Sequence, residues 1–196
     1  MGIEQASEPD DVRAKRWRPR IVLRFWGDQS GSTVVEFSML LLPFLLLLFA
    51  ILETCISFAA GQVMANAVDD VSRQIRTGQI KADGLNATNL HNLICGKLEM
   101  MVASGCPGLA IDLRTEDTFS KLAAIPMPIT GTGDERTINA GMTQVQKPRS
   151  LQKSMLRVLY PWPIMTNMMQ KSLSTLADGK ILLLATATWQ NEPFDD

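Results

Sequence analysis

The sequence has few of the residues on which enzyme chemistry most often depends. It holds a single histidine, His91, and only 6% of its residues are aromatic. It contains no Gly-x-Ser-x-Gly nucleophile elbow and no glycine-rich phosphate-binding loop. The acidic pairs Asp69-Asp70 and Glu116-Asp117 fit ordinary solvated helix or turn surfaces. We therefore predict that the protein is not an enzyme and needs no cofactor.

Metal and nucleic-acid binding also have little support. His91, Cys95 and Cys106 offer three possible ligands, whereas a structural zinc site needs four. The formal net charge is −1, and acidic residues precede the basic cluster near the N-terminus, so that cluster is a poor nucleic-acid surface. We expect no bound metal, no nucleic-acid partner and no small-molecule substrate.

Charge is nearly absent from one long stretch. From Phe37 to Ala60 the only charged residue is Glu53. At about 1.5 Å per residue, a helix of this length crosses a hydrocarbon core of roughly 30 Å. We therefore predict a membrane span over about 37–60. The alternative is an apolar core helix of a soluble protein. Glu53 lies about 24 Å along the helix from Phe37, near the far interface, where a carboxylate can reach water.

Pro43 lies inside this span and removes the hydrogen bond to the carbonyl of Met39, so we expect a bend there. The freed carbonyl needs another donor or a neighbouring helix, which is compatible with packing in an assembly and equally with a harmless transmembrane proline.

Basic residues predict the orientation of the span. Because they gather ahead of it, the N-terminus should stay in the cytoplasm and the remainder should lie in the periplasm, anchored in the inner membrane. They are Arg13, Lys15, Arg16, Arg18, Arg20 and Arg24.

The junction before the span resembles a peptidase processing site. Gly31 has no Cβ and permits close approach to the scissile bond. Cleavage after Gly31 would start the mature chain at Ser32, whose new amine would lie one helical turn from Glu36 and just before Phe37. Such an ion pair interacts by about 4 kcal/mol before desolvation, at ~4 Å and an effective dielectric near 20.

Two other interpretations of these residues remain open. Thr33-x-x-Glu36 also fits a helix capping box, which requires no peptidase and is compatible with one. Ser57-Phe58-Ala59 offers the small residues that signal peptidase prefers, although the apolar region before it is longer than usual. Retention of the span is favoured over removal of a signal peptide.

Beyond the span the sequence predicts an α+β domain. We expect a basic leader over 1–31, a long helix over 32–78 and a periplasmic domain over 79–196 with an antiparallel sheet. The expected elements are helices at Asn86–Ser104 and Thr166–Ala177, strands at Leu109–Thr115, Ser154–Tyr160 and Ile181–Trp189, and a long loop at Ala124–Pro148.

The three cysteines differ in their surroundings. Cys55 falls within the span and is expected to be a packed thiol. Cys95 and Cys106 would both face an oxidising compartment, so we predict a Cys95–Cys106 disulfide, which contributes about 3 kcal/mol in the chain-entropy account.

Taken together, these residues resemble TadE-like proteins, the minor pilins or pseudopilins of the tight-adherence (Flp-type) pilus system. The resemblance rests on Gly31 to Phe37, the leucine-rich span with Pro43, Ile94-Cys95 with Cys106, the segment Arg157 to Pro163, and the terminal Asn191-Glu192-Pro193-Phe194. It implies cleavage after Gly31 by the prepilin peptidase of the system, and partnership with other pilus subunits and assembly-platform proteins.

The resemblance is to a minor subunit and not to the bulk pilin. The major pilin of this system is much shorter and usually has tyrosine where Ser38 stands here. The alternative is an uncleaved, membrane-anchored periplasmic binding or scaffold protein.

The first testable prediction concerns the mature N-terminus. Pilin-type processing leaves Ser32 first and removes about 3.5 kDa, because roughly 31 residues of about 110 Da are lost. Edman sequencing and intact mass of the membrane-extracted protein measure both. A mature chain that starts at Ala60 would instead indicate signal peptidase, and an intact Met1 would indicate no processing.

Overall fold

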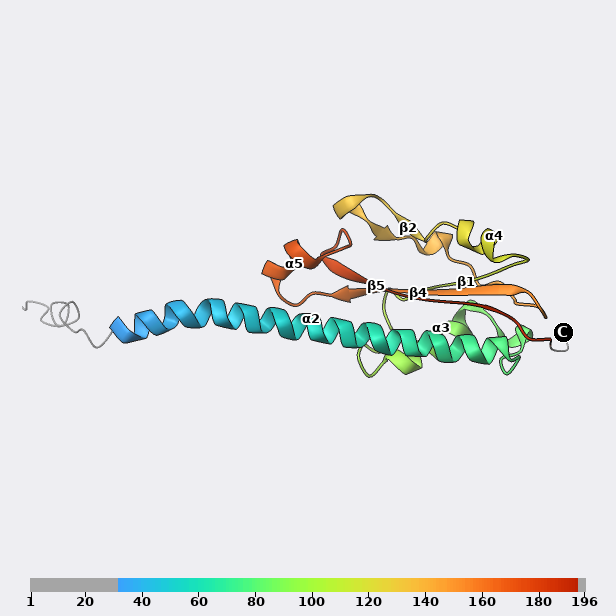
Figure 1. Ribbon diagram of the computed structural model, residues 1–196, viewed down its shortest axis with the longest axis horizontal. Coiled ribbons are helices and arrows are strands. Elements are labelled where there is room, and N and C mark those ends of the chain that lie inside the picture. Colours follow the sequence, from blue (N-terminus) through green and yellow to red (C-terminus); the bar gives the residue numbers. More distant parts are fainter. Residues whose placement is uncertain (1–31, 194–196) are drawn as a thin grey trace, which may run out of the picture. The chain divides into compact units, whose positions relative to one another are not determined.

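The computed structural model describes residues 32–193, which fall into two compact units on either side of the Leu46–Leu47 bond. Helix α2 begins in the first unit, and its later part belongs to the second, which holds every other element (Figure 1). The result is a mixed α+β protein with an antiparallel sheet, which confirms the predicted fold class. The helices and strands are α2 (Ser32–Arg76), α3 (Ala87–Leu98), β1 (Ala110–Glu116), α4 (Phe119–Ala124), β2 (Ile129–Thr130), β3 (Thr137–Ile138), β4 (Lys153–Pro163), α5 (Asn167–Leu173) and β5 (Lys180–Gln190).

The main sheet has the order β1-β4-β5, with both pairs antiparallel. All three predicted strands are present, and β4 runs further than expected, through Pro161 to Pro163. Proline lacks the N–H that a central strand donates to its neighbours. Proline is tolerated here because β1 begins only at Ala110, opposite Leu159, so that Pro161 and Pro163 have only β5 beside them.

One face of the sheet packs against the later part of α2 and against α3. The helical spacing of Ala60, Met64, Val68, Val71 and Ile75 puts a continuous apolar stripe on α2, and all five are buried. Alternate strand residues meet this stripe, as the two-residue period of a strand requires. The strand side chains in this core are Ile111, Leu113, Leu156, Val158, Tyr160, Trp162, Ala185 and Trp189.

Helix α3 starts where the sequence predicted and ends earlier. Asn86 caps it by accepting a hydrogen bond from the Asn89 amide at 2.8 Å. The prediction that the helix continues to Ser104 is wrong. A helix running on to Cys106 would carry it about 16 Å from Cys95, at 1.5 Å per residue, whereas the disulfide holds their Cα atoms 5.8 Å apart. The chain must therefore turn back after Leu98.

An exposed ion pair joins α3 to α2. The Lys97 ammonium lies 2.5 Å from the Asp70 carboxylate. The hydrogen bond from Lys97, together with its charge, lowers the pKa of Asp70 below its ordinary value. The contribution of this ion pair to stability is therefore present above the ordinary pKa of an aspartate. It is lost as the pH falls through the lowered pKa of Asp70.

The opposite face of the sheet is covered by segments that the sequence did not predict. Helix α4 packs on β1 and β4, and β2 and β3 pair as a short antiparallel ladder (Figure 1). The expected loop over 124–148 is therefore wrong in part. Strands of two residues are too short for any periodic pattern to reveal.

A buried ion network joins these covering segments to the sheet. Asp112 on β1 stands directly opposite Arg157 on β4, and the two are 0% and 4% exposed. The Arg157 Nη2 donates to Asp112 Oδ2 at 2.6 Å, and its Nη1 donates to the Ile125 carbonyl at 3.1 Å. The other Asp112 oxygen accepts from Arg114 Nε at 2.7 Å and from the Gln144 amide at 2.9 Å. Both carboxylate oxygens are thus satisfied.

The second testable prediction concerns this network. Arg157→Met leaves the Asp112 carboxylate buried beside one remaining arginine, so the free energy of unfolding should fall by about 3 kcal/mol or more. Guanidinium unfolding in mild detergent, followed by fluorescence of the buried Trp162 and Trp189, measures it.

The matched control is Lys121→Met, which breaks the exposed Lys121–Asp117 pair. Its effect should stay within about 0.5 kcal/mol. Equal stabilities for Arg157→Met and Lys121→Met would contradict a structural role for the network.

Candidate functional site

The processing junction lies at the start of α2. Gly31 is outside the described residues, and Ser32 is the first residue of the helix. Glu36 follows one turn later, and Glu36 and Phe37 are exposed. The capping-box interpretation of Thr33 and Glu36 stays open, because both residues lie at the start of α2. Cleavage at Gly31 and pairing by Glu36 stay predictions.

The segment after the junction exposes apolar side chains all around the helix. Among residues 32–193, α2 is the one helix long and apolar enough to cross a membrane, and its most apolar window has no buried residue. This exposure argues against a soluble core helix, which protein would cover on at least one side. The exposed large side chains are Val34, Val35, Phe37, Met39, Leu40, Leu42, Phe44, Leu45, Leu46, Leu47, Leu48, Phe49, Ile51, Leu52, Ile56 and Phe58.

Protein cover on α2 begins at Ser57 and Ala60. Pro43 lies inside the helix ahead of this point. Cys55 also lies ahead of it and is an exposed free thiol, so the expectation of a packed thiol is wrong for the isolated chain. The helix thus changes surroundings within a few residues of Cys55.

Glu53 connects α2 to the loop that follows β4. Its Oε1 accepts hydrogen bonds from the backbone amides of Met165, at 2.5 Å, and Thr166, at 3.4 Å. Its Oε2 is buried and has no hydrogen-bond partner among the described residues. The side chain is half-exposed, and the sequence did not predict its bond to backbone amides just before α5. We call this the Glu53 contact.

A second contact joins the other end of the sheet to the end of α2. Arg76 Nη2 and Glu192 Oε1 lie 3.3 Å apart, and the Glu192 amide donates to the Arg76 carbonyl at 3.1 Å. We call this the Arg76 contact. It falls directly after β5, in the terminal motif on which the family resemblance drew.

Between the two contacts, the helix and strand β4 have nearly the same length. From Glu53 to Arg76 the helix rises about 35 Å at 1.5 Å per residue. Strand β4 has 11 residues and spans about 36 Å at 3.3 Å per residue. Because β4 begins near the Arg76 contact and ends near the Glu53 contact, it runs antiparallel to the covered part of α2.

Asn191 fixes the terminal motif from inside. Its Oδ1 accepts from the Trp189 indole at 2.7 Å and from the Ser154 hydroxyl at 3.4 Å, while its Nδ2 donates to the Arg149 carbonyl at 2.8 Å. The residue is 2% exposed. This network holds the segment after β5 in place, so that Glu192 reaches Arg76. The neighbouring residues Asn191 and Glu192 thus act together, one inside the domain and the other on α2.

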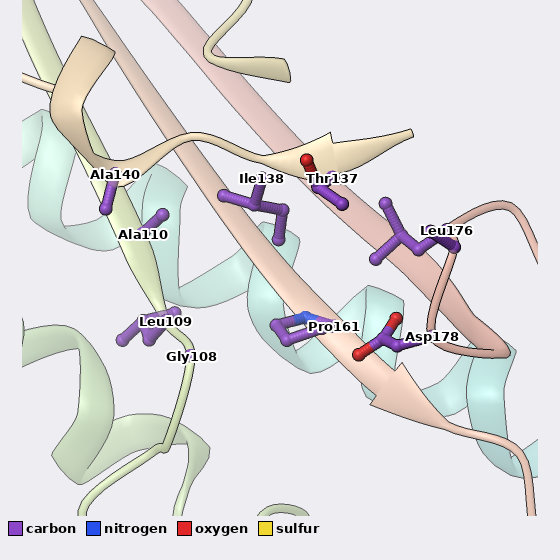
Figure 2. Close-up of a pocket in the computed structure, with 10 residues that line it drawn as sticks. Gly108, Leu109, Ala110, Thr137, Ile138, Ala140, Pro161, Leu176 and Asp178 are labelled. Carbon is purple, nitrogen blue, oxygen red and sulfur yellow. The ribbon is translucent and has the colours of Figure 1, made fainter. Parts of the chain in front are cut away.

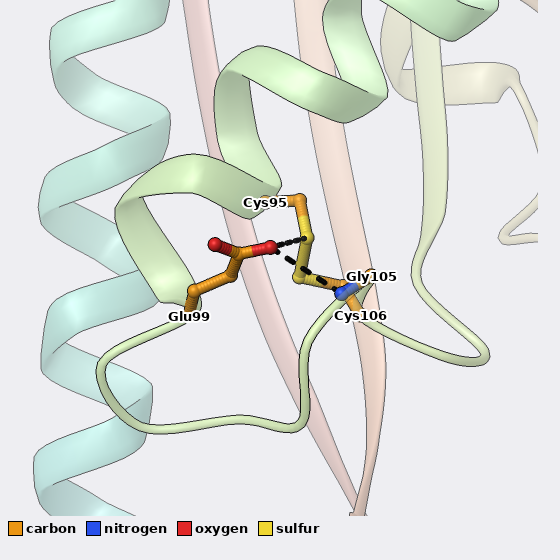
Figure 3. The surroundings of a disulfide bond; sticks show 4 residues. All are labelled: Cys95, Glu99, Gly105 and Cys106. Carbon is orange, nitrogen blue, oxygen red and sulfur yellow. Dashed lines mark hydrogen bonds between the residues drawn. A yellow bond between two sulfur atoms is a disulfide. The ribbon is translucent and has the colours of Figure 1, made fainter.

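The predicted Cys95–Cys106 disulfide is present (Figure 3). The Glu99 carboxylate lies beside it and accepts a hydrogen bond from the Gly105 amide at 3.3 Å. Gly108 follows with φ at +82°, and a Cβ there would lie 2.8 Å from Pro161 Cγ, so glycine is required for this turn to approach β4. The disulfide thereby holds the turn around Gly108 against β4.

An apolar pocket of about 490 Å³ lies where this turn meets β4 (Figure 2). Leu109, Ile138 and Leu176 line it, and its one ionisable lining residue, Asp178, is paired with Lys180. Catalytic pockets usually gather several polar groups around such a hollow. This pocket offers no nucleophile with a neighbouring base.

The remaining candidate residues do not form a metal site. His91 is half-buried on α3, and both cysteines considered with it, Cys95 and Cys106, are joined in the disulfide. Within residues 32–193 no three histidine, cysteine or acidic side chains lie together as a metal ion would require.

Comparison with known proteins identifies the N-terminal segment. The family model described as TadE-like protein matches residues 31–73, which confirms the resemblance over the junction, the apolar segment and most of α2. No curated protein and no solved structure matched the chain.

The third testable prediction concerns the Glu53 contact. Glu53→Ala removes an acceptor shared by two backbone amides, so hydrogen exchange of a peptide covering Met165 and Thr166 should accelerate by about tenfold or more. Glu53→Gln keeps an acceptor oxygen and should give a smaller acceleration. Mass-spectrometric hydrogen exchange measures both.

The matched control is Asp69→Ala, an exposed acid on the same helix. It should leave exchange at Met165 and Thr166 unchanged. Wild-type exchange in Glu53→Ala would mean that the contact does not order this loop.

Proposed function

We propose that this chain, whose residues 31–73 match the TadE-like family, is a minor pilin or pseudopilin that helps assemble a tight-adherence, Flp-type pilus. Its role is structural and not catalytic. The observation that carries the proposal is the position of the match, which covers a possible cleavage point and the exposed apolar part of one continuous helix.

The first step is cleavage after Gly31 by the prepilin peptidase at the cytoplasmic face of the inner membrane. This frees an amine at Ser32, the first residue of α2. Glu36, one turn further on, then pairs with that amine in its own chain or in a neighbouring subunit. Since an ion is costly in hydrocarbon, the pairing favours registers in which every amine meets a carboxylate.

The second step is exchange of lipid for protein around α2. In the membrane, lipid covers the exposed apolar side chains, and in the pilus or its priming complex the helices of other subunits replace it. The Glu53 and Arg76 contacts hold the periplasmic domain to the covered part of the helix. A subunit recognised through its domain therefore brings this part of its helix with it.

The orientation follows from the basic residues before the span, which keep the N-terminus in the cytoplasm and the domain in the periplasm. The partners are then the prepilin peptidase, other pilus subunits and the assembly platform. The disulfide agrees with a periplasmic domain, because disulfides persist in that oxidising compartment.

The fourth testable prediction separates this role from that of an uncleaved anchored scaffold. Gly31→Val crowds the scissile bond, so the chain should keep the roughly 3.5 kDa that processing removes. Glu36→Gln should be processed normally, yet its co-purification with other pilus subunits should fall about tenfold, which corresponds to 1.4 kcal/mol of lost interaction.

The control is Asp69→Asn, which neutralises an exposed acid of α2 outside the Glu53 and Arg76 contacts and should assemble normally. Immunoblotting of sheared pili and of membranes measures processing and incorporation. If Gly31→Val and Glu36→Gln both behave as wild type, the chain acts as an uncleaved scaffold.

A further inference from the structure

The Glu53 contact places a loop of the domain beside a part of α2 that still exposes apolar side chains. Met165 and Thr166 bind Glu53, and further toward the domain Ile56 and Phe58 remain 45% and 69% exposed. The first fully buried residues of α2 are Ser57 and Ala60. The loop between β4 and α5 therefore lies level with helix surface that water would not solvate well.

Helix geometry gives the depth of this loop. From Phe37 a helix needs about 20 residues to cross a hydrocarbon core of roughly 30 Å, which places the outer boundary near residue 57. Glu53 lies a turn before that boundary. A loop bound to Glu53 then lies close to this boundary, where the hydrocarbon core meets the interfacial layer, because its two amides are within hydrogen-bond distance of the carboxylate.

The chemistry of the loop and of α5 suits this layer. Met165 is 81% exposed, although methionine is an apolar residue. From Ile164 to Ala177 the only charged residue is Lys171, which is basic and exposed. Apolar side chains combined with positive charge are typical of surfaces that bind the headgroup region of anionic bilayers.

The opposite end of the sheet has a different composition. There the charged residues Glu116, Asp117 and Lys121 surround the start of α4, and the Arg76 contact holds this end about 35 Å further along α2. Exposed apolar residues near the two ends thus have different charged neighbours. At the end bound to Glu53, Asp178 is paired with Lys180, and the segment 163–173 itself has Lys171 as its only charged residue.

We propose that the segment 163–173, the end of β4 with the following loop and α5, is a membrane-docking surface. Met165 inserts among the lipids of the outer leaflet of the inner membrane, and Lys171 lies among anionic headgroups. The proposal rests on the proposed function in one respect, namely that α2 spans the membrane. Its consequence is that release of a subunit from the bilayer must break this contact as well as the lipid contacts of the helix.

Depth-dependent quenching tests the proposal on the full chain. In a Cys55→Ala background that keeps the disulfide, Met165→Cys carries an environment-sensitive fluorophore. The protein is reconstituted in phosphatidylcholine and phosphatidylglycerol vesicles that contain lipids spin-labelled near the headgroup. Emission from position 165 should fall by about twofold or more relative to unlabelled lipid, because the loop sits at that depth.

Two matched positions make the result decisive. Phe119→Cys, an exposed apolar position on α4 at the far end of the sheet, should show almost no quenching. Leu47→Cys, within the apolar part of α2, should be quenched by lipids spin-labelled deep in the acyl chain and reports whether the helix spans.

Quenching at Leu47 without quenching at Met165 overturns the docking surface and leaves the proposed function intact. Absence of quenching at both positions overturns both. Equal quenching at Met165 and Phe119 also overturns the docking surface, because it would mean that the domain contacts lipid without a preferred end. Loss of quenching at Met165 when phosphatidylglycerol is omitted would confirm the contribution of Lys171.

Discussion

Helix α2 has two parts with different surroundings, and the placement of the sheet and of the other helices follows from this difference. The part of α2 before Ser57 exposes apolar side chains in every direction, and the part after Ala60 buries one stripe against the sheet. Neither part is stable in the surroundings of the other, since bare apolar surface is unfavourable in water and a polar face is unfavourable in lipid. The position of this change along the helix decides where the domain lies relative to a bilayer.

The Glu53 and Arg76 contacts bracket the covered part of the helix. Each joins a side chain of α2 to a backbone or side-chain group at one end of the sheet, and the lengths of helix and strand agree within a residue or so. Such contacts contribute little stability individually when they are exposed. Their value is positional, because together they limit sliding of the sheet along the helix. In the proposed function, that limit allows recognition of the domain to align its helix with those of other subunits.

Inside the domain, the Asp112–Arg157 pair has a comparable positional role. It connects both strands to the end of α4 and to the segment before β4, through bonds to Ile125 and Gln144. These covering segments have little regular structure and a small apolar core of their own. Their placement depends on charged groups that are fully satisfied, since an incompletely paired ion at this depth would be destabilising. The disulfide has the same effect for the turn after α3.

Local sequence pattern is enough to predict several parts of this protein. A long apolar run with a single charge, long enough to cross a bilayer, predicts the span, period-two alternation predicts the strands, and cysteines beyond the span predict the disulfide. Other features follow from contacts between distant segments. The pairing of Asp112 with Arg157 and the capture of the Met165 amide by Glu53 join residues far apart in the chain. No periodicity encodes such pairings, because they follow from strand register and from which end of the sheet lies beside which turn of α2.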